Sequence, residues 1–153
     1  MSQAPHPISL IAVVFTNVHV QAIAEHKYTE EATIGHVENN LSVKEAEEED
    51  RVYVAVMRTT VNKAGDPAHP YIIDVECHGA FKVDDTLTKA EAKRGLLITA
   101  HSVLHGAIRE TVGWLTGRQP HGSITLPLSV LNLKPREHPA PKASEPGSAA
   151  DED

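Results

Sequence analysis

Residues 51–83 carry the strongest structural pattern in the chain, two strand-like runs separated by a turn. Residues 51–61 are rich in β-branched side chains, and residues 63–67, Lys-Ala-Gly-Asp-Pro, have the composition of a turn. Residues 71–83 alternate apolar and polar side chains, which is typical of a strand with one buried face. A β-hairpin is therefore predicted here, and the rest of the fold has to be arranged around it.

The two strands of this hairpin distribute their apolar residues differently. In the second strand the apolar residues share one face, and the other face carries polar residues that include Asp74 and Glu76. In the first strand Val54 lies on one side and Met57 on the other, each among further apolar residues, so that both sides are apolar. We expect a partner chain or a bound ligand to cover the second side.

Two further strands are predicted before the hairpin. Residues 8–24 form a long apolar run that we predict to be a strand, with the possibility of a bulge within it. Strict alternation gives this strand two apolar faces, with Phe15 on one and Val18 on the other. Residues 32–45 are a weaker candidate, because Gly35 and the pair Asn39-Asn40 interrupt them.

After the hairpin the apolar period changes from two to about 3.6, which indicates a helix. Thr88 and Glu91 have the spacing of a capping box, so the helix should begin at residue 89 and end near Gly117. Gly95 and Gly106 leave open a division into two helices. The expected buried stripe, at mixed spacings of three and four, comprises Leu97, Ala100, Leu104, Ala107, Ile108, Thr111 and Leu115.

Four strands followed by a helical region predict an α+β fold, a four-stranded antiparallel sheet with helices packed on one face. Residues 123–133 are apolar but interrupted by Pro127, and we expect an extended segment lying over the core. Residues 8–133 would form one domain. Residues 1–7 and the Pro-rich acidic tail, residues 134–153, are expected to be disordered.

Composition excludes several classes of function. The 153-residue chain has a formal net charge of −7, which disfavours binding to nucleic acid or to an anionic membrane. Its one cysteine, Cys77, rules out an internal disulfide framework and favours the cytoplasm. The apolar run at residues 8–15 is too short to span a bilayer, so no membrane insertion is expected.

Catalytic motifs are not found, and we expect neither an enzyme nor a cofactor. No Gly-Lys-Ser/Thr phosphate loop and no Gly-x-Ser-x-Gly elbow is present, and Cys77 and its neighbour point to opposite faces of a strand. His101 and His105, four residues apart, have the spacing of a zinc pair but lack a third ligand. Trp114 fits either a core position or the rim of an apolar groove, and spacing favours the core.

The sequence of residues 103–118 resembles the SecB family of protein-export chaperones. The resemblance is carried by Arg109-Glu110 in the helix, by Arg118, and by the extended Ile-Thr-Leu-Pro of residues 124–127. The hairpin matches as well, through Val-Tyr-Val at residues 52–54 and Gly-Ala-Phe-x-Val at residues 79–83. The similarity extends diffusely over residues 8–133.

This resemblance implies a homotetramer, a dimer of dimers, whose apolar grooves hold unfolded polypeptide without ATP for protein export. The candidates for lining such a groove are Phe15, Val37, Leu41, Trp114, Ile124 and Leu126. Asp74 and Glu76 are the candidates for docking the translocation motor SecA.

The chain also departs from the family pattern. The region of the first strand where the family carries docking carboxylates, residues 14–23, has none here, and the family's final helix is replaced by the Pro-rich tail. A SecB-like chaperone that holds the antitoxin of a toxin–antitoxin system fits these losses at least as well. A small-molecule binding module or an oligomeric scaffold remains the alternative from another class.

Overall fold

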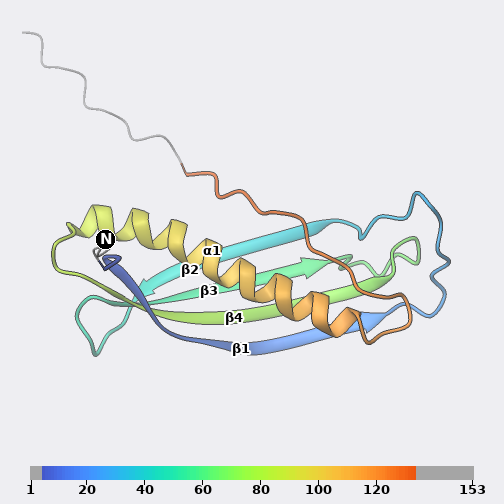
Figure 1. Ribbon diagram of the computed structural model, residues 1–153, viewed down its shortest axis with the longest axis horizontal. Coiled ribbons are helices and arrows are strands. Elements are labelled where there is room, and N and C mark those ends of the chain that lie inside the picture. Colours follow the sequence, from blue (N-terminus) through green and yellow to red (C-terminus); the bar gives the residue numbers. More distant parts are fainter. Residues whose placement is uncertain (1–4, 134–153) are drawn as a thin grey trace, which may run out of the picture.

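Four strands form one antiparallel sheet in the order β1-β4-β3-β2, and a long helix lies on one face (Figure 1). The computed structural model describes residues 5–133, so most of the N-terminal segment and the whole acidic tail, for which we expect disorder, lie outside the described residues. The elements are β1 (Ile8–Ala22), β2 (Val37–Glu45), β3 (Val52–Val61), β4 (Tyr71–Val83) and α1 (Lys89–Thr116). The predicted α+β class and antiparallel sheet are confirmed.

The predicted hairpin is β3-β4, in antiparallel register with Met57 opposite Cys77. Its turn is fixed at Asn62, which has a positive φ of 48°. The Asn62 side-chain amide donates hydrogen bonds to the carbonyl oxygens of Asp66 (3.0 Å) and Tyr71 (3.2 Å), and its Oδ1 accepts one from the Asp66 N–H (2.9 Å). One asparagine side chain thus satisfies main-chain groups on both sides of the turn.

Two bulges in β1 change which of its side chains share a face. The pairing with β4 skips one residue at Ile11 and another at Thr16, so Phe15 lies opposite Cys77 and Val18 opposite Val75. Both apolar residues therefore lie on the helix-covered face of the sheet. The strict alternation expected from the sequence, which put Phe15 and Val18 on opposite faces, was wrong because each bulge reverses the parity of the residues that follow it.

Helix α1 begins with the predicted capping box, in which the Thr88 hydroxyl accepts from the Glu91 N–H and the Glu91 carboxylate accepts from the Thr88 N–H. The helix runs without a break through Gly95 and Gly106 to Gly117, so one helix is present where two were possible. The predicted stripe was wrong in four of its seven members, because the contact row advances by four residues at each step and winds round the axis. This row comprises Leu96, Ala100, Leu104, Ile108, Val112 and Thr116.

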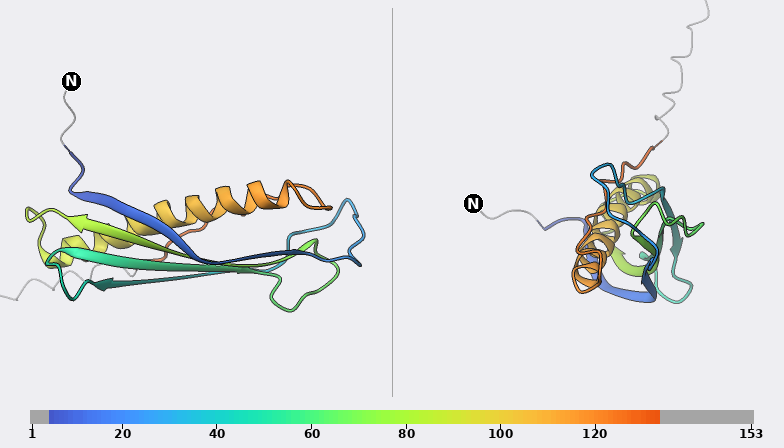
Figure 2. Two further views of the ribbon diagram at one scale, coloured as in Figure 1. Left: turned by 90° about the horizontal axis from the view of Figure 1, so that it is seen from below. Right: turned by 90° about the vertical axis from the view of Figure 1, so that its right-hand side faces the viewer.

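The core lies between α1 and the covered face of the sheet, mainly over β4, which is a central strand. Its largest fully buried side chains include Tyr71, Phe81, Met57, Leu104 and Leu126. Within the described residues the opposite sheet face carries no helix (Figure 2), and apolar side chains such as Val54 on it are half-buried. No helix in residues 5–133 is long and apolar enough to cross a bilayer.

Residues 123–133, which we call the strap, run back along α1 in extended conformation, as predicted (Figure 1). Leu126 inserts its side chain into the core and is fully buried, whereas Leu128 and Val130 are each 80% exposed. In β2 the strand begins at Val37 rather than at residue 32, because Gly35 adopts a φ of +95° that a β-strand does not use.

Candidate binding site

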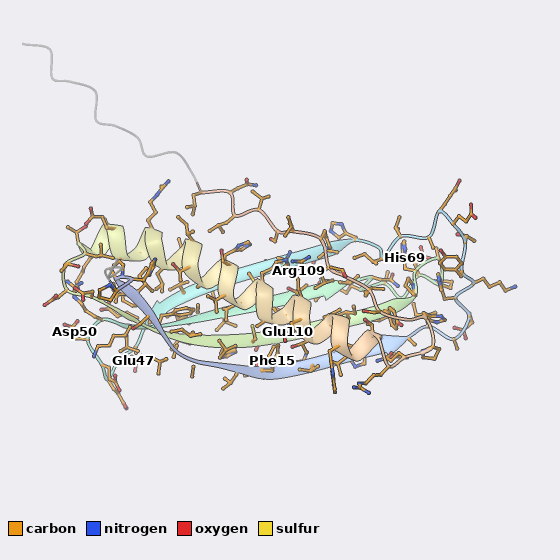
Figure 3. All side chains as sticks on the ribbon, in the orientation of Figure 1. Phe15, Glu47, Asp50, His69, Arg109 and Glu110 are labelled. Carbon is orange, nitrogen blue, oxygen red and sulfur yellow. The ribbon has the colours of Figure 1, made fainter. Side chains whose placement is uncertain are left out.

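A cavity of about 400 Å³, which we call the end pocket, opens where the helix ends and the loops converge. Three segments that are distant in the sequence form it: the β1–β2 loop, the end of the β3–β4 turn at Pro70, and the turn from α1 into the strap. The lining residues are His26, Tyr28, Ala32, Thr33, Ile34, Pro70, Pro120, His121, Ser123 and Ile124. Figure 3 labels His69, the neighbour of Pro70, at this end of the molecule.

Two histidines hold the walls of the end pocket together. A nitrogen of His26, Nδ1, donates to the carbonyl oxygen of Pro67 (2.9 Å), and Nε2 of His121 donates to that of Ile23 (2.7 Å). The two rings meet edge to face with centroids 5.0 Å apart. Because a carbonyl oxygen can only accept, these bonds fix which nitrogen of each neutral ring carries the proton.

Tyr71 lies behind the lining residue His121, with ring centroids 5.7 Å apart, and its hydroxyl donates to the Gly122 carbonyl oxygen at 2.7 Å. Burial raises the pKa of Tyr71, against the smaller lowering effect of a hydrogen bond at His121. The pocket is thus walled by prolines and aliphatic side chains with a few fixed polar groups, which suits an apolar side chain or a small apolar molecule.

The six predicted groove residues are distributed over four places: the exposed surface, β2 beside the core, the end pocket and the core. Phe15 on β1 (Figure 3) and Trp114 on α1 are exposed, by 37% and 60%. Val37 and Leu41 are half-buried on β2 against the core. Ile124 lines the end pocket and is the one member that does so, whereas Leu126 is in the core.

Trp114 is therefore a surface residue, and the interpretation that spacing favoured, a core position, was wrong. The adjacent contact row of α1 already fills the core, which leaves Trp114 on the outer side of the helix. Its ring is covered in part by the guanidinium group of Arg118, 4.6 Å from the ring centroid.

A row of side chains on α1, four residues apart, holds the strap by its main chain. Arg109 donates from Nε to the Leu126 carbonyl oxygen (2.8 Å), and His105 donates from Nε2 to that of Pro127 (3.0 Å). Further along, the His101 ring lies 2.9 Å from the Ser129 hydroxyl. Figure 3 labels Arg109 between the helix and the strap.

His101 and His105, the candidate zinc pair, are stacked with ring centroids 5.8 Å apart. Each ring uses its Nε2 to contact the strap, and the other nitrogen of His105 is buried without a hydrogen-bond partner. Among the described residues no group of three or more possible ligands is close enough to hold a metal ion. Burial lowers the pKa of His101, and the neighbouring His105 adds to this effect.

Asp74 and Glu76, the candidate docking carboxylates, lie on the uncovered sheet face and are each engaged within the chain. Arg58 forms a bidentate ion pair with Asp74 (2.9 and 2.6 Å), and its hydrogen bonds lower the pKa of that carboxyl. Glu76 accepts hydrogen bonds from Thr16 (2.7 Å) and His78 (3.1 Å), which lower its pKa.

Nine of the ten residues that line the end pocket were not identified from the sequence, which named Ile124 alone. The available signal was the pairing of proline with histidine, at His69-Pro70 and Pro120-His121. Such pairs mark loops, but nothing in their spacing shows that two loops 50 residues apart in the chain meet in space.

Comparison with known proteins shows the fold. A SecB-like chaperone of Mycobacterium tuberculosis, Rv1957, solved in complex with a ChAD peptide from the HigA1 antitoxin Rv1956, aligns with a TM-score of 0.55 and 17% identity over 82% of this chain and 88% of that chain. A protein of unknown function from Streptococcus agalactiae aligns with a TM-score of 0.47 and 12% identity, over 82% and 100%. No family model and no curated protein matches the sequence. The fold is SecB-like.

Proposed function

We propose that this protein is an ATP-independent chaperone that holds unfolded polypeptide. The observation that carries the proposal is the exposed apolar surface of β1 on the helix-covered side of the sheet, where Leu10, Phe15 and Val18 are 37–49% exposed. Soluble monomers rarely expose a contiguous apolar surface of this kind without a binding partner. A SecB-like fold supports the same conclusion, since the M. tuberculosis neighbour was solved with a bound peptide.

The proposal includes a homotetramer, a dimer of dimers, which would cover part of this surface. β1 is an edge strand whose outer main-chain groups have no neighbouring strand in the described chain, and Ile98 and Trp114 add exposed apolar area on α1. Client binding would use the remaining apolar surface and the end pocket, at about 25 cal/mol per Å² of apolar area buried and with little dependence on client sequence.

The test is suppression of light scattering by an aggregating, chemically denatured enzyme in the absence of nucleotide, with the mass in solution measured on the same sample. Trp114→Glu and Phe15→Glu should each weaken suppression, because a charge is introduced into apolar contact surface. Ser102→Glu, on an exposed position of the same helix, is the matched control and should behave as the wild type. A monomer that fails to suppress aggregation would refute the proposal.

The client could be of two kinds. It is either an export preprotein that is delivered to SecA, or the antitoxin of a toxin–antitoxin system. One observation favours the antitoxin: the Arg58 ion pair neutralises Asp74, which reduces the acidity of the face on which SecA would dock. Affinity purification of the tagged protein from its own cells decides between them. Recovery of SecA supports export, and recovery of an antitoxin encoded beside the gene supports the second form.

A small-molecule binding module is the second candidate function, and the volume of the end pocket favours it, because about 400 Å³ lies within the usual range for ligand sites. Ile124→Trp would fill this pocket. If the end pocket binds a small apolar molecule and takes no part in client binding, the substitution should abolish binding of that molecule and leave suppression of aggregation unchanged. A loss of suppression would instead place client binding in this pocket.

A further inference from the structure

The strap is held in the manner in which a protein holds an extended guest peptide. It contributes one buried anchor, Leu126, while its neighbours Thr125 and Pro127 are exposed. Its main chain is bound by side chains of α1: the carbonyl oxygens of Leu126 and Pro127 accept from Arg109 and His105. In residues 5–133 no backbone–backbone hydrogen bond joins the strap to β2 or to α1.

Main-chain contacts of this kind do not require a particular sequence. Any extended polypeptide offers the two carbonyl oxygens that His105 and Arg109 bind, and any chain with a leucine-sized apolar side chain can fill the site of Leu126. The strap also begins in the end pocket, because Ser123 and Ile124 line it. Removing the strap would therefore open the pocket towards the surface of α1 that the strap now covers.

We propose that the strap occupies a polypeptide groove of its own chain, and that an extended client segment takes its place. This inference rests on the proposed chaperone function and specifies where that function binds and how it is restrained. The strap competes with the client, so the affinity that is measured equals the intrinsic affinity multiplied by the fraction of molecules with the strap displaced.

The outer part of the strap has a polar attachment that can be removed without touching the core. The Ser129 hydroxyl lies 2.9 Å from Nε2 of His101 and accepts a hydrogen bond from Nδ2 of Asn39 at 3.3 Å. Asn39 in turn accepts from the Thr59 hydroxyl at 2.6 Å, which connects the strap to β3. Ser129→Ala removes this attachment while leaving Leu126 in place.

Ser129→Ala should bind a reduced, carboxymethylated and fluorescently labelled ribonuclease about fivefold more tightly than the wild type. Fivefold is the factor that corresponds to about 1 kcal/mol, the net value of one hydrogen bond. Ser102→Ala, an exposed serine on α1, is the control and should leave affinity unchanged. Unchanged or weaker binding by Ser129→Ala, with a lower urea midpoint, would overturn the inference and make the strap a structural wall.

A second measurement detects the displacement itself. Val130→Cys places a nitroxide label at an 80% exposed position, and Cys77 is buried and does not compete for the reagent. Saturation with the unfolded ribonuclease should increase the mobility of the label; an immobile label on a client-bound protein would overturn the inference. If the wild type and both serine variants all fail to bind the unfolded ribonuclease, the proposed chaperone function itself is refuted. If all three bind it equally well, only the inference about the strap is refuted.

Discussion

Gly79 on β4 lies under Leu104 of α1 with no room for a side chain, and Gly79→Ala tests the packing described above. A Cβ atom added at this position of β4 would lie 2.7 Å from Cε2 of Phe81 and 2.9 Å from Cδ2 of Leu104. Both contacted atoms belong to the ends of side chains, but both side chains are fully buried. Neither can move aside without displacing further core residues.

The expected magnitude is a net loss of about 1–2 kcal/mol of unfolding free energy. Forcing a methyl group into a filled core costs about 1–3 kcal/mol. Replacing glycine by alanine in a strand recovers about 0.5–1 kcal/mol, because glycine loses more backbone entropy on folding. With a urea slope of about 2 kcal/mol/M, the midpoint should fall by about 0.5–1 M.

Gly106→Ala is the matched control, because it adds the same methyl group to an open position. A Cβ atom at Gly106, inside α1, would meet nothing within 4 Å. This variant should gain about 1 kcal/mol from helix propensity, and its midpoint should rise by about 0.5 M. Both variants are unfolded in urea at one protein concentration, since association adds to stability. A neutral or stabilised Gly79→Ala would refute the close packing of α1 on β4.

Three further predictions concern buried groups. Leu126→Ala should cost about 2–5 kcal/mol in urea unfolding, because its side chain is fully buried, whereas Leu128→Ala, at 80% exposure, should cost little. Burial lowers the pKa of His101, so on acidification the unfolded chain binds a proton at this side chain before the folded chain does. The contribution of His101 to stability should therefore be complete above about pH 6.5 and be lost as the pH falls through the lower pKa of the folded state. His101→Gln should flatten this part of the pH profile of the urea midpoint. Burial raises the pKa of Cys77 to about 11, so a disulfide reagent at pH 8 should react slowly with the native protein and rapidly in urea; equal rates would contradict the burial of this thiol.

Local patterns predicted the fold best where a single rule decides the structure. The alternation of apolar and polar residues in β4 correctly predicted the first and last residues of this strand. The spacing of Thr88 and Glu91 correctly predicted the first residue of α1. The faces of β1 were predicted wrongly, because a bulge adds one residue without leaving a mark in a uniformly apolar run.

The site was less predictable than the fold, because it is made by contacts between distant segments. The partial exposure of Phe15 reflects the position of β1 at the edge of the sheet, and this is a matter of strand order. The end pocket needs the hydrogen bonds of His26 and His121 to carbonyl oxygens about 40 and 100 residues away along the chain. None of these distances is visible in a local pattern.

The two bulges of β1 also determine where this strand tolerates a change of length. Ile11 and Thr16 are the residues that the pairing with β4 skips, so losing either one would leave every other β1 side chain on its present face. Losing a residue further from the two bulges would reverse the faces of a segment of the strand. In an alignment with homologues, single-residue gaps in β1 should therefore fall at position 11 or 16, and a gap there is compatible with the same fold.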